Sequence, residues 1–180
     1  NMRILFVANE IPYPPDNGVG IVTHHAMRLM HRAGHQLALA VLTEDADHAE
    51  RYFKDAAMFC QKDMAWWMPL MQRSRLELFV AAIAKNTLVF IERYASNIFR
   101  AKLRRLIQEF KPDVIHFDLI PMTQYIGLVP DGVGTVASIN DSWALTLEGW
   151  LQSPRYFGFE RIYRKYELWR VRRYERTVYP

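Results

Sequence analysis

Short runs of apolar residues alternate along this chain with segments whose apolar residues recur at helical spacing. The apolar runs predict strands of a parallel sheet, because such strands are covered on both faces. The predicted strands cover residues 3–8, 37–42, 65–68, 114–117 and 135–139. This alternation predicts the α/β class: a doubly wound parallel sheet with right-handed crossovers and helices on both faces.

Helical periodicity fills the segments between these strands. The predicted helices cover residues 21–33, 47–58, 76–83, 91–110 and a last segment that begins at Ser153-Pro154. Gly34 supplies the stop for the first helix, since glycine readily adopts the left-handed conformation found after helix ends. We expect the two middle helices to cross one face of the sheet.

Length and composition limit the class of protein further. With 180 residues, of which 51% are apolar, the chain can bury one sizeable core in one domain. The formal charge of +4 favours anionic partners without choosing between nucleic acid, acidic lipid and a phosphorylated ligand. Cys60 has no partner for an internal disulfide, and no apolar run approaches the roughly 20 residues of a membrane span. We therefore expect a cytoplasmic protein.

Polar residues follow several of the predicted strands. In a doubly wound sheet the ligand lies beyond the carboxyl ends of the strands, so these residues are candidates for a binding site. They are Asn9, Glu10, Gly18, Gly20, Glu44, His116, Asp118, Asn140 and Asp141. The competing interpretation is that most of them cap helices or shape turns.

The first strand leads through a proline-containing loop to Gly18-Val19-Gly20, at the start of a predicted helix. Backbone N–H groups and the positive end of a helix at such a place can bind a phosphate. The alternative is a dinucleotide fingerprint with Glu44 as its acidic residue, which would indicate an oxidoreductase that binds NAD(P) or another nucleotide. Two features disfavour this fingerprint. The position of its third glycine is occupied by Thr23. The first strand is separated from the glycines by residues Asn9–Asn17, whereas the fingerprint needs an immediate turn.

Several segments together resemble a known family. They are Met2–Val7, the loop Pro14–Gly20, Ala33–Leu37, Lys111–His116 and the strand that ends at Asn140-Asp141. In this order and spacing they are similar to the amino-terminal half of family 4 glycosyltransferases. The resemblance implies a Rossmann-like doubly wound sheet that forms one half of the two-domain GT-B architecture.

The same resemblance implies a function. Relatives are retaining transferases that move a sugar from a nucleotide-sugar donor to a glycan or lipid-linked acceptor, with neither a catalytic metal nor another cofactor. Residues 2–180 then form the acceptor-side domain, and the carboxyl-terminal domain that holds the nucleotide sugar is absent from this chain, which we expect to be inactive alone. The expected setting is the synthesis of cell-surface polysaccharide or glycolipid.

Site residues follow from the resemblance and from the strand ends. Gly18 and Gly20 match the family loop that approaches the donor diphosphate and the acceptor, and Asp141 and Asn140 are the expected catalytic positions. Asn140 stands where many relatives carry histidine, and an amide cannot shuttle a proton near neutral pH. The further residues expected to bind substrate or donor phosphate are Asn17, Glu10, His24, His116 and Asp118.

Four histidines cluster in sequence at His24, His25, His31 and His35. Only His31 and His35 have the i, i+4 spacing of helical metal ligands, and Gly34 ends the helix between them. We therefore expect no metal site. His24 or His25 could instead line a cleft near Gly18 and Gly20, and the favoured alternative is a surface or packing role.

Basic and aromatic residues gather in two regions, 66–105 and 161–176. A basic helix with an aromatic face can lie on an anionic bilayer, which would make the protein peripheral on the inner face of the membrane. The alternative is a solvated helix face whose arginine stems cover the core. A noncatalytic nucleic-acid binder is a third possibility, but it needs stacked aromatics on an open sheet face, whereas the strand residues look buried. We therefore expect no nucleic-acid partner.

Overall fold

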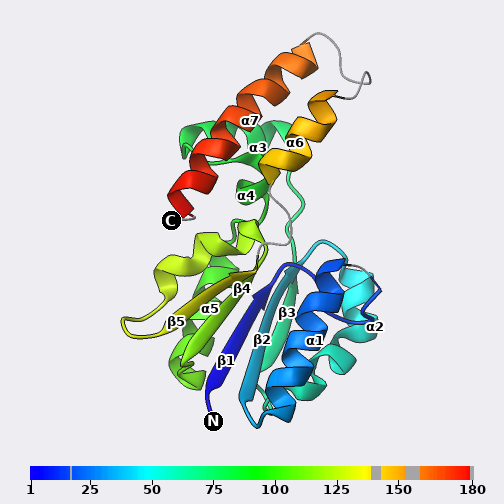
Figure 1. The fold of residues 1–180 in the computed structure, drawn as a ribbon, viewed down its shortest axis with the longest axis vertical. Coiled ribbons are helices and arrows are strands. Elements are labelled where there is room, and N and C mark those ends of the chain that lie inside the picture. Colours follow the sequence, from blue (N-terminus) through cyan, green and yellow to red (C-terminus); the bar gives the residue numbers. More distant parts are fainter. Residues whose placement is uncertain (17, 139–142, 153–158, 179–180) are drawn as a thin grey trace.

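The computed structural model describes residues 1–16, 18–138, 143–152 and 159–178. Within them, five parallel strands form one sheet in the order β3-β2-β1-β4-β5 (Figure 1). The strands are β1 (Arg3–Ala8), β2 (Gln36–Thr43), β3 (Ala65–Pro69), β4 (Val114–Asp118) and β5 (Gly134–Ser138). The predicted α/β class and the five predicted strands are confirmed.

Helices connect the strands, and two more follow the last described strand. They are α1 (Gly18–Arg32), α2 (Ala46–Ala56), the 3-10 turn η1 (Ala57–Phe59), α3 (Arg75–Ala84), α4 (Val89–Arg93), α5 (Asn97–Phe110), the 3-10 segment η2 (Ile120–Leu128), α6 (Trp143–Gln152) and α7 (Phe159–Val178). Gly34 follows α1 with a φ of 83°, as its predicted role as a stop requires. The predicted helix start at Ser153-Pro154 lies outside the described residues.

The sheet buries its two faces against different helices. Ile4 and Phe6 of β1 pack with α1 and α2, whereas Leu5 and Val7 pack with α5 and η2. Successive strand residues point to opposite faces, so the apolar residues from Ile4 to Ala8 of β1 serve both layers. The continuous apolar runs in the sequence therefore mark strands that are covered on both sides.

The two middle helices differ from the prediction. The segment predicted as one helix over 91–110 is broken, because Ser96 caps α5 by accepting a hydrogen bond from the Phe99 N–H at 3.1 Å. Of this region only α5 packs on the sheet. Helices α3, α4, α6 and α7 instead form a layer above the carboxyl ends of the strands (Figure 1).

This helical layer has a small core of its own. Its buried residues come from α4, η2, α6 and α7 and the residue before α4: Leu88, Ile91, Ile120, Ala144, Leu147 and Val171. Tyr125 of η2 joins the layer to the sheet, since its hydroxyl donates to the Tyr94 carbonyl at 2.6 Å and its ring lies in the core below. The layer is therefore held over the strand ends, where the sequence places its candidate residues.

Strand β5 is also different from the prediction, which treated it as another buried strand. Thr135, Val136 and Ala137 are exposed, and 47% of the Val136 surface is accessible. The cause is position: β5 pairs with β4 on one side, and no described strand pairs with its other edge. An apolar run alone does not distinguish an edge strand from a central one.

Candidate functional site

The strand order reverses between β1 and β4. The chain moves from β1 to β2 and β3 on one side, then returns to β4 and β5 on the other. A crevice forms beyond the carboxyl ends of the strands at such a switch point, and ligands of doubly wound sheets bind there. Asn9 and Glu10 follow β1 at this point, and Asp118 ends β4.

A buried hydrogen bond connects α1 to the end of β4. The Thr23 hydroxyl donates to Oδ2 of Asp118, and both residues are at most 1% exposed. Oδ1 of Asp118 is buried and has no hydrogen-bond partner among the described residues. A buried carboxylate oxygen without a partner is costly, so it suits a hydroxyl or amide supplied by a ligand.

The electrostatic environment of Asp118 follows from its position. Burial raises the pKa of Asp118 to about 6, and the hydrogen bond from Thr23 opposes this rise. Glu10 adds to the rise because its negative charge repels a second carboxylate nearby. The switch point therefore carries two neighbouring acidic groups, one of which changes charge close to neutral pH.

Leu119 directly follows this carboxylate with an unusual backbone conformation. Its φ of 63° and ψ of 158° lie in a region that residues with side chains rarely adopt. Its N–H donates to the Ser138 carbonyl at 3.0 Å, which links the ends of β4 and β5. Strained residues gather at functional sites, and this one lies at the switch point.

The proline loop between β1 and α1 is fixed by neighbouring helices. His48 of α2 donates from Nε2 to the Tyr13 carbonyl at 2.8 Å. The Tyr13 ring lies 5.6 Å from the His24 ring and 6.1 Å from that of Tyr52, between centroids. The loop is therefore packed against α1 and α2.

His24 takes part in this aromatic packing. Its ring also lies 5.5 Å from the Phe59 ring, on the α2 side of α1. Burial lowers the pKa of His24, and the neighbouring His25 lowers it further. A substrate role for His24 stays a prediction, and its visible contacts are those of a packing residue.

The glycines begin α1 as predicted. Gly18 is exposed, and among the described residues a Cβ built on it would meet no heavy atom within 4 Å. Gly20 is buried on the face of α1 that also carries Thr23. Asn17, Asn140 and Asp141 lie outside the described residues, so their expected roles stay predictions.

His116 is half-buried and lies farther from the end of β4 than Asp118 does. It is in the interior of β4, paired with Phe6 and Val136, and its ring lies 5.0 Å from that of Phe6. Burial lowers the pKa of His116, and its buried Nδ1 has no partner among the described residues. It shares a face of β4 with Asp118, two residues below the strand end.

The sequence identified Asp118 and Glu10 as candidates, but it did not identify Thr23 and Leu119, the other residues described at the switch point. In the sequence, Thr23 is notable only as a departure from a glycine motif, and no pattern marks Leu119. Thr23 lies 95 residues from Asp118, so no local pattern connects the two. The nearest usable signal is helical spacing, which places Thr23 one turn after Gly20 on the buried face of α1.

The raised pKa of Asp118 predicts how stability depends on pH. The folded protein keeps the proton to a higher pH than the unfolded chain does, so the contribution of Asp118 to stability is lost as the pH rises through about 6. Asp118→Asn retains the acceptor for Thr23 but cannot ionise. Between about pH 5 and about pH 8, the wild-type free energy of unfolding should fall by about 1 kcal/mol relative to this variant.

Urea unfolding of both proteins across this range measures the difference. A constant difference between the two pH profiles would contradict the raised pKa. Titration of the Asp118 carboxyl carbon by NMR provides a direct control, with a midpoint expected near 6.

Comparisons with known proteins give the family. A search of curated proteins finds no match. The family model described as Glycosyltransferase Family 4 matches residues 16–180. The match runs from the end of the proline loop through α1, the switch-point strand β4 and the helical layer, so it includes most of the site described above. This chain belongs to glycosyltransferase family 4.

Proposed function

We propose that this chain is the acceptor-side domain of a retaining glycosyltransferase that moves a sugar from a nucleotide-sugar donor to a glycan or lipid-linked acceptor. The supporting observation is the acidic switch point, where Asp118 presents a buried oxygen without a described partner beside Glu10. Carboxylates accept hydrogen bonds from hydroxyl groups, and charged acceptors form the stronger bonds. An acceptor sugar fits this chemistry.

In this proposal, the start of α1 approaches the donor phosphates. The exposed Gly18 leaves room for a phosphate to reach backbone N–H groups at the positive end of a 15-residue helix. A second domain holds most of the nucleotide sugar, and the cleft between the two domains brings donor and acceptor together. Asp141 and Asn140, which follow β5, are the proposed polar contacts to the transferred sugar.

The alternatives receive less support. A dinucleotide fingerprint requires its glycines in an immediate turn, but residues 9–17 separate β1 from Gly18. A nucleic-acid binder needs aromatic residues on an open sheet face. The exposed strand β5 reads Gly-Thr-Val-Ala-Ser and contains no aromatic residue.

A bulky residue at Gly18 should block transfer without unfolding the protein. Gly18→Leu fills the space in front of α1, so we expect sugar transfer to fall at least about tenfold with an unchanged melting temperature. Gly127→Leu is the matched control, because Gly127 is also exposed with nothing described within 4 Å of its Cβ position.

The assay follows transfer from UDP-glucose and GDP-mannose to a cellular lipid and glycan extract by the natural full-length protein. Equal activity of the two variants would contradict the role of the glycine loop. Failure of the wild-type protein to transfer sugar from any nucleotide sugar would contradict the proposed function itself.

We also propose that the protein docks on an anionic membrane through a face formed by α3 and α7. This α3–α7 face exposes six large apolar or aromatic side chains: Leu76, Phe79, Val80, Ile83, Tyr166 and Trp169. The first four are spaced as one helical stripe, with 36–71% of each surface accessible. Phe79 and Ile83 line the same shallow hollow as Tyr166, so the two helices contribute to one surface.

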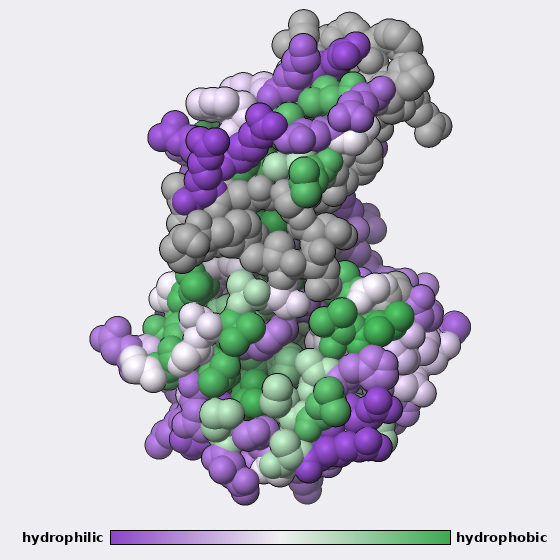
Figure 2. Space-filling model, viewed as in Figure 1, coloured by the Kyte–Doolittle hydropathy of each residue, from purple (hydrophilic) through white to green (hydrophobic). Residues whose placement is uncertain are grey.

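The charges around this face favour an anionic bilayer as its occupant. Arg170 lies over the Tyr166 ring and Arg173 over the Trp169 ring, at 5.8 and 6.0 Å from the ring centroids. Figure 2 shows hydrophilic residues along α7 with hydrophobic residues between them. Aromatic, aliphatic and basic side chains in this arrangement are typical of helices that lie at a membrane surface. In the described parts of the chain, no helix combines the length and apolar composition needed to cross a bilayer.

Vesicle binding tests this face. Ile83→Glu removes a 53% exposed apolar side chain from the α3–α7 face and adds a charge that anionic lipid repels. We expect about tenfold weaker sedimentation with phosphatidylcholine vesicles that contain phosphatidylglycerol. Ile98→Glu on α5, where Ile98 is 63% exposed, is the matched control and should bind like the wild type. Equal losses in both variants, or no binding of the wild-type protein, would refute membrane docking through this face.

A further inference from the structure

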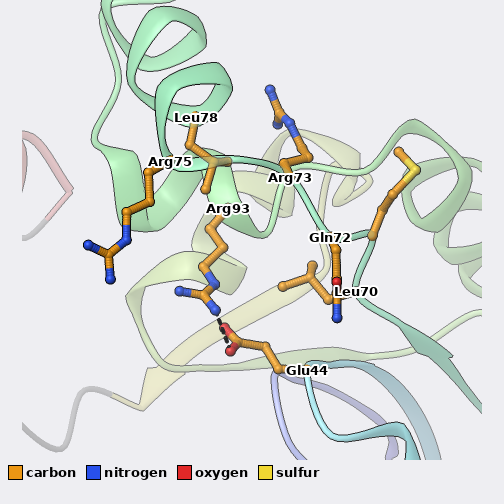
Figure 3. A pocket seen from close by; sticks show the side chains of 8 residues that line it. Glu44, Leu70, Gln72, Arg73, Arg75, Leu78 and Arg93 are labelled. Atoms are coloured by element: carbon orange, nitrogen blue, oxygen red, sulfur yellow. Dashed lines mark hydrogen bonds and ion pairs between the residues drawn. The ribbon is translucent and has the colours of Figure 1, made fainter.

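A hollow lined by arginines lies beside the switch point, on the β2 and β3 side of the same sheet edge. Its volume is about 370 Å³, within the range of small-molecule sites. The lining residues are Glu44, Leu70, Met71, Gln72, Arg73, Arg75, Leu78 and Arg93 (Figure 3). We call it the arginine pocket.

The floor of the arginine pocket is fixed by Glu44, directly after β2. Arg93 donates from Nη2 to Oε2 of Glu44 at 2.6 Å, and the Tyr94 hydroxyl donates to Oε1 at 3.0 Å. Figure 3 shows Arg93 reaching toward Glu44 across the hollow. With its carboxylate held by two donors, Glu44 compensates the charge of Arg93 and orients it.

Arg73 belongs to a second ion-pair group. Its Nη1 lies 3.0 Å from Oε1 of Glu92, and Nζ of Lys85 lies 2.7 Å from the same oxygen. Burial disfavours the charged form of Glu92, but the hydrogen bonds from Lys85 and Arg73 outweigh it and hold the pKa of Glu92 below its usual range. One carboxylate thus compensates two cations.

Arg75 supplies the charge that nothing compensates. It is exposed at the start of α3, and no described residue forms an ion pair with its guanidinium. The nearby Glu77 carboxylate is engaged in the capping box with Ser74. Three carboxylates surround the pocket, those of Glu44, Glu77 and Glu92. Four cations accompany them: Arg73, Arg75, Arg93 and Lys85. The local excess of positive charge lies at the exposed Arg75.

The arginine pocket is connected to the acidic switch point. Tyr94 binds Glu44, and the Asn9 side chain at the end of β1 acts on the same hydroxyl, where it opposes the rise in the pKa of Tyr94. Glu10 is the next residue, and its charge acts on Asp118. The carboxyl edge thus presents an acidic zone and a basic zone side by side along one surface.

We propose that the arginine pocket binds a phosphoryl group of the acceptor while a hydroxyl of that acceptor lies at the acidic switch point. The proposal rests on the proposed function and adds the chemical class of the acceptor. Arginine suits this role because its planar guanidinium donates in pairs to phosphate oxygens. Leu70, Met71 and Leu78 give the pocket an apolar wall for the part of the acceptor next to the phosphate.

Calorimetric titration of the natural full-length protein with inorganic pyrophosphate tests the pocket at constant ionic strength. Arg75→Gln removes the uncompensated charge without breaking a described ion pair. We expect saturable binding of pyrophosphate by the wild type and about tenfold weaker binding by this variant. Arg104→Gln is the matched control, because Arg104 is an exposed arginine on α5, away from the pocket. It should bind pyrophosphate like the wild type.

Two further arms identify the source of the phosphate. Glucose 1-phosphate represents a soluble phosphorylated sugar, and vesicles containing phosphatidic acid represent a lipid phosphate. If the wild type binds one of these two ligands more tightly and Arg75→Gln loses that binding, the result supports the phosphate pocket and identifies the source of the phosphate. Absence of saturable pyrophosphate binding up to about 10 mM, or equal weakening in Arg104→Gln, would overturn the proposal.

These outcomes are separable from those of the proposed function. Sugar transfer that is unaffected by Arg75→Gln would leave the transferase intact and refute the phosphate pocket. Pyrophosphate binding that depends on Arg75, in a protein that transfers no sugar, would retain the anion site and refute the transferase.

Discussion

The parallel pairing of β1 with two neighbours is the constraint on which the rest of this structure depends. β1 pairs with β2 from Arg3 to Ala8 on one side, and from Ile4 to Val7 it pairs with β4 on the other. Because the strands are parallel, all of them end at one edge. The connections on the two sides of β1 run in opposite directions, and ligands of doubly wound sheets bind beyond the strand ends at such a reversal. The loop that leads to Gly18, the acidic groups of the switch point and the arginine pocket all lie along that edge.

The edge divides into zones of different charge. The switch point carries Glu10 and Asp118, whereas the β2 and β3 side carries Arg73, Arg75 and Arg93. A ligand that extends along the edge would meet hydrogen-bond acceptors at one end and cations at the other, so its orientation would be fixed by charge. The helical layer above the edge adds a third surface, the apolar α3–α7 face. These surfaces are the basis of the proposal that the acceptor is phosphorylated and is delivered from a membrane.

Much of the fold could be predicted from the sequence, for a physical reason. Strands covered on both faces are mostly apolar, so β1 and β2 are visible in the sequence as continuous apolar runs. Gly34 marks the end of α1 because its backbone needs a positive φ. The position of α3 could not be predicted. An amphipathic stripe such as Leu76 to Ile83 has the same spacing whether it packs on a sheet or lies exposed, and only the tertiary structure distinguishes the two.

The candidate site was predictable only in outline. Strand ends identify Glu10 and Asp118, since their place in the chain fixes their place at the sheet edge. The Thr23 hydrogen bond, the strained backbone of Leu119 and the arginine pocket depend on contacts between distant segments, which leave no local pattern.

Hydrogen–deuterium exchange of the natural full-length protein tests most directly whether the carboxyl edge is the functional edge. Exchange would be compared with and without each of a series of nucleotide sugars that includes UDP-glucose and GDP-mannose. We expect the donor to slow exchange in the loop before α1, at the start of α1 and beyond the end of β4, within residues 9–24 and 116–120. Slower exchange confined to α5 or to the amino ends of the strands would contradict it.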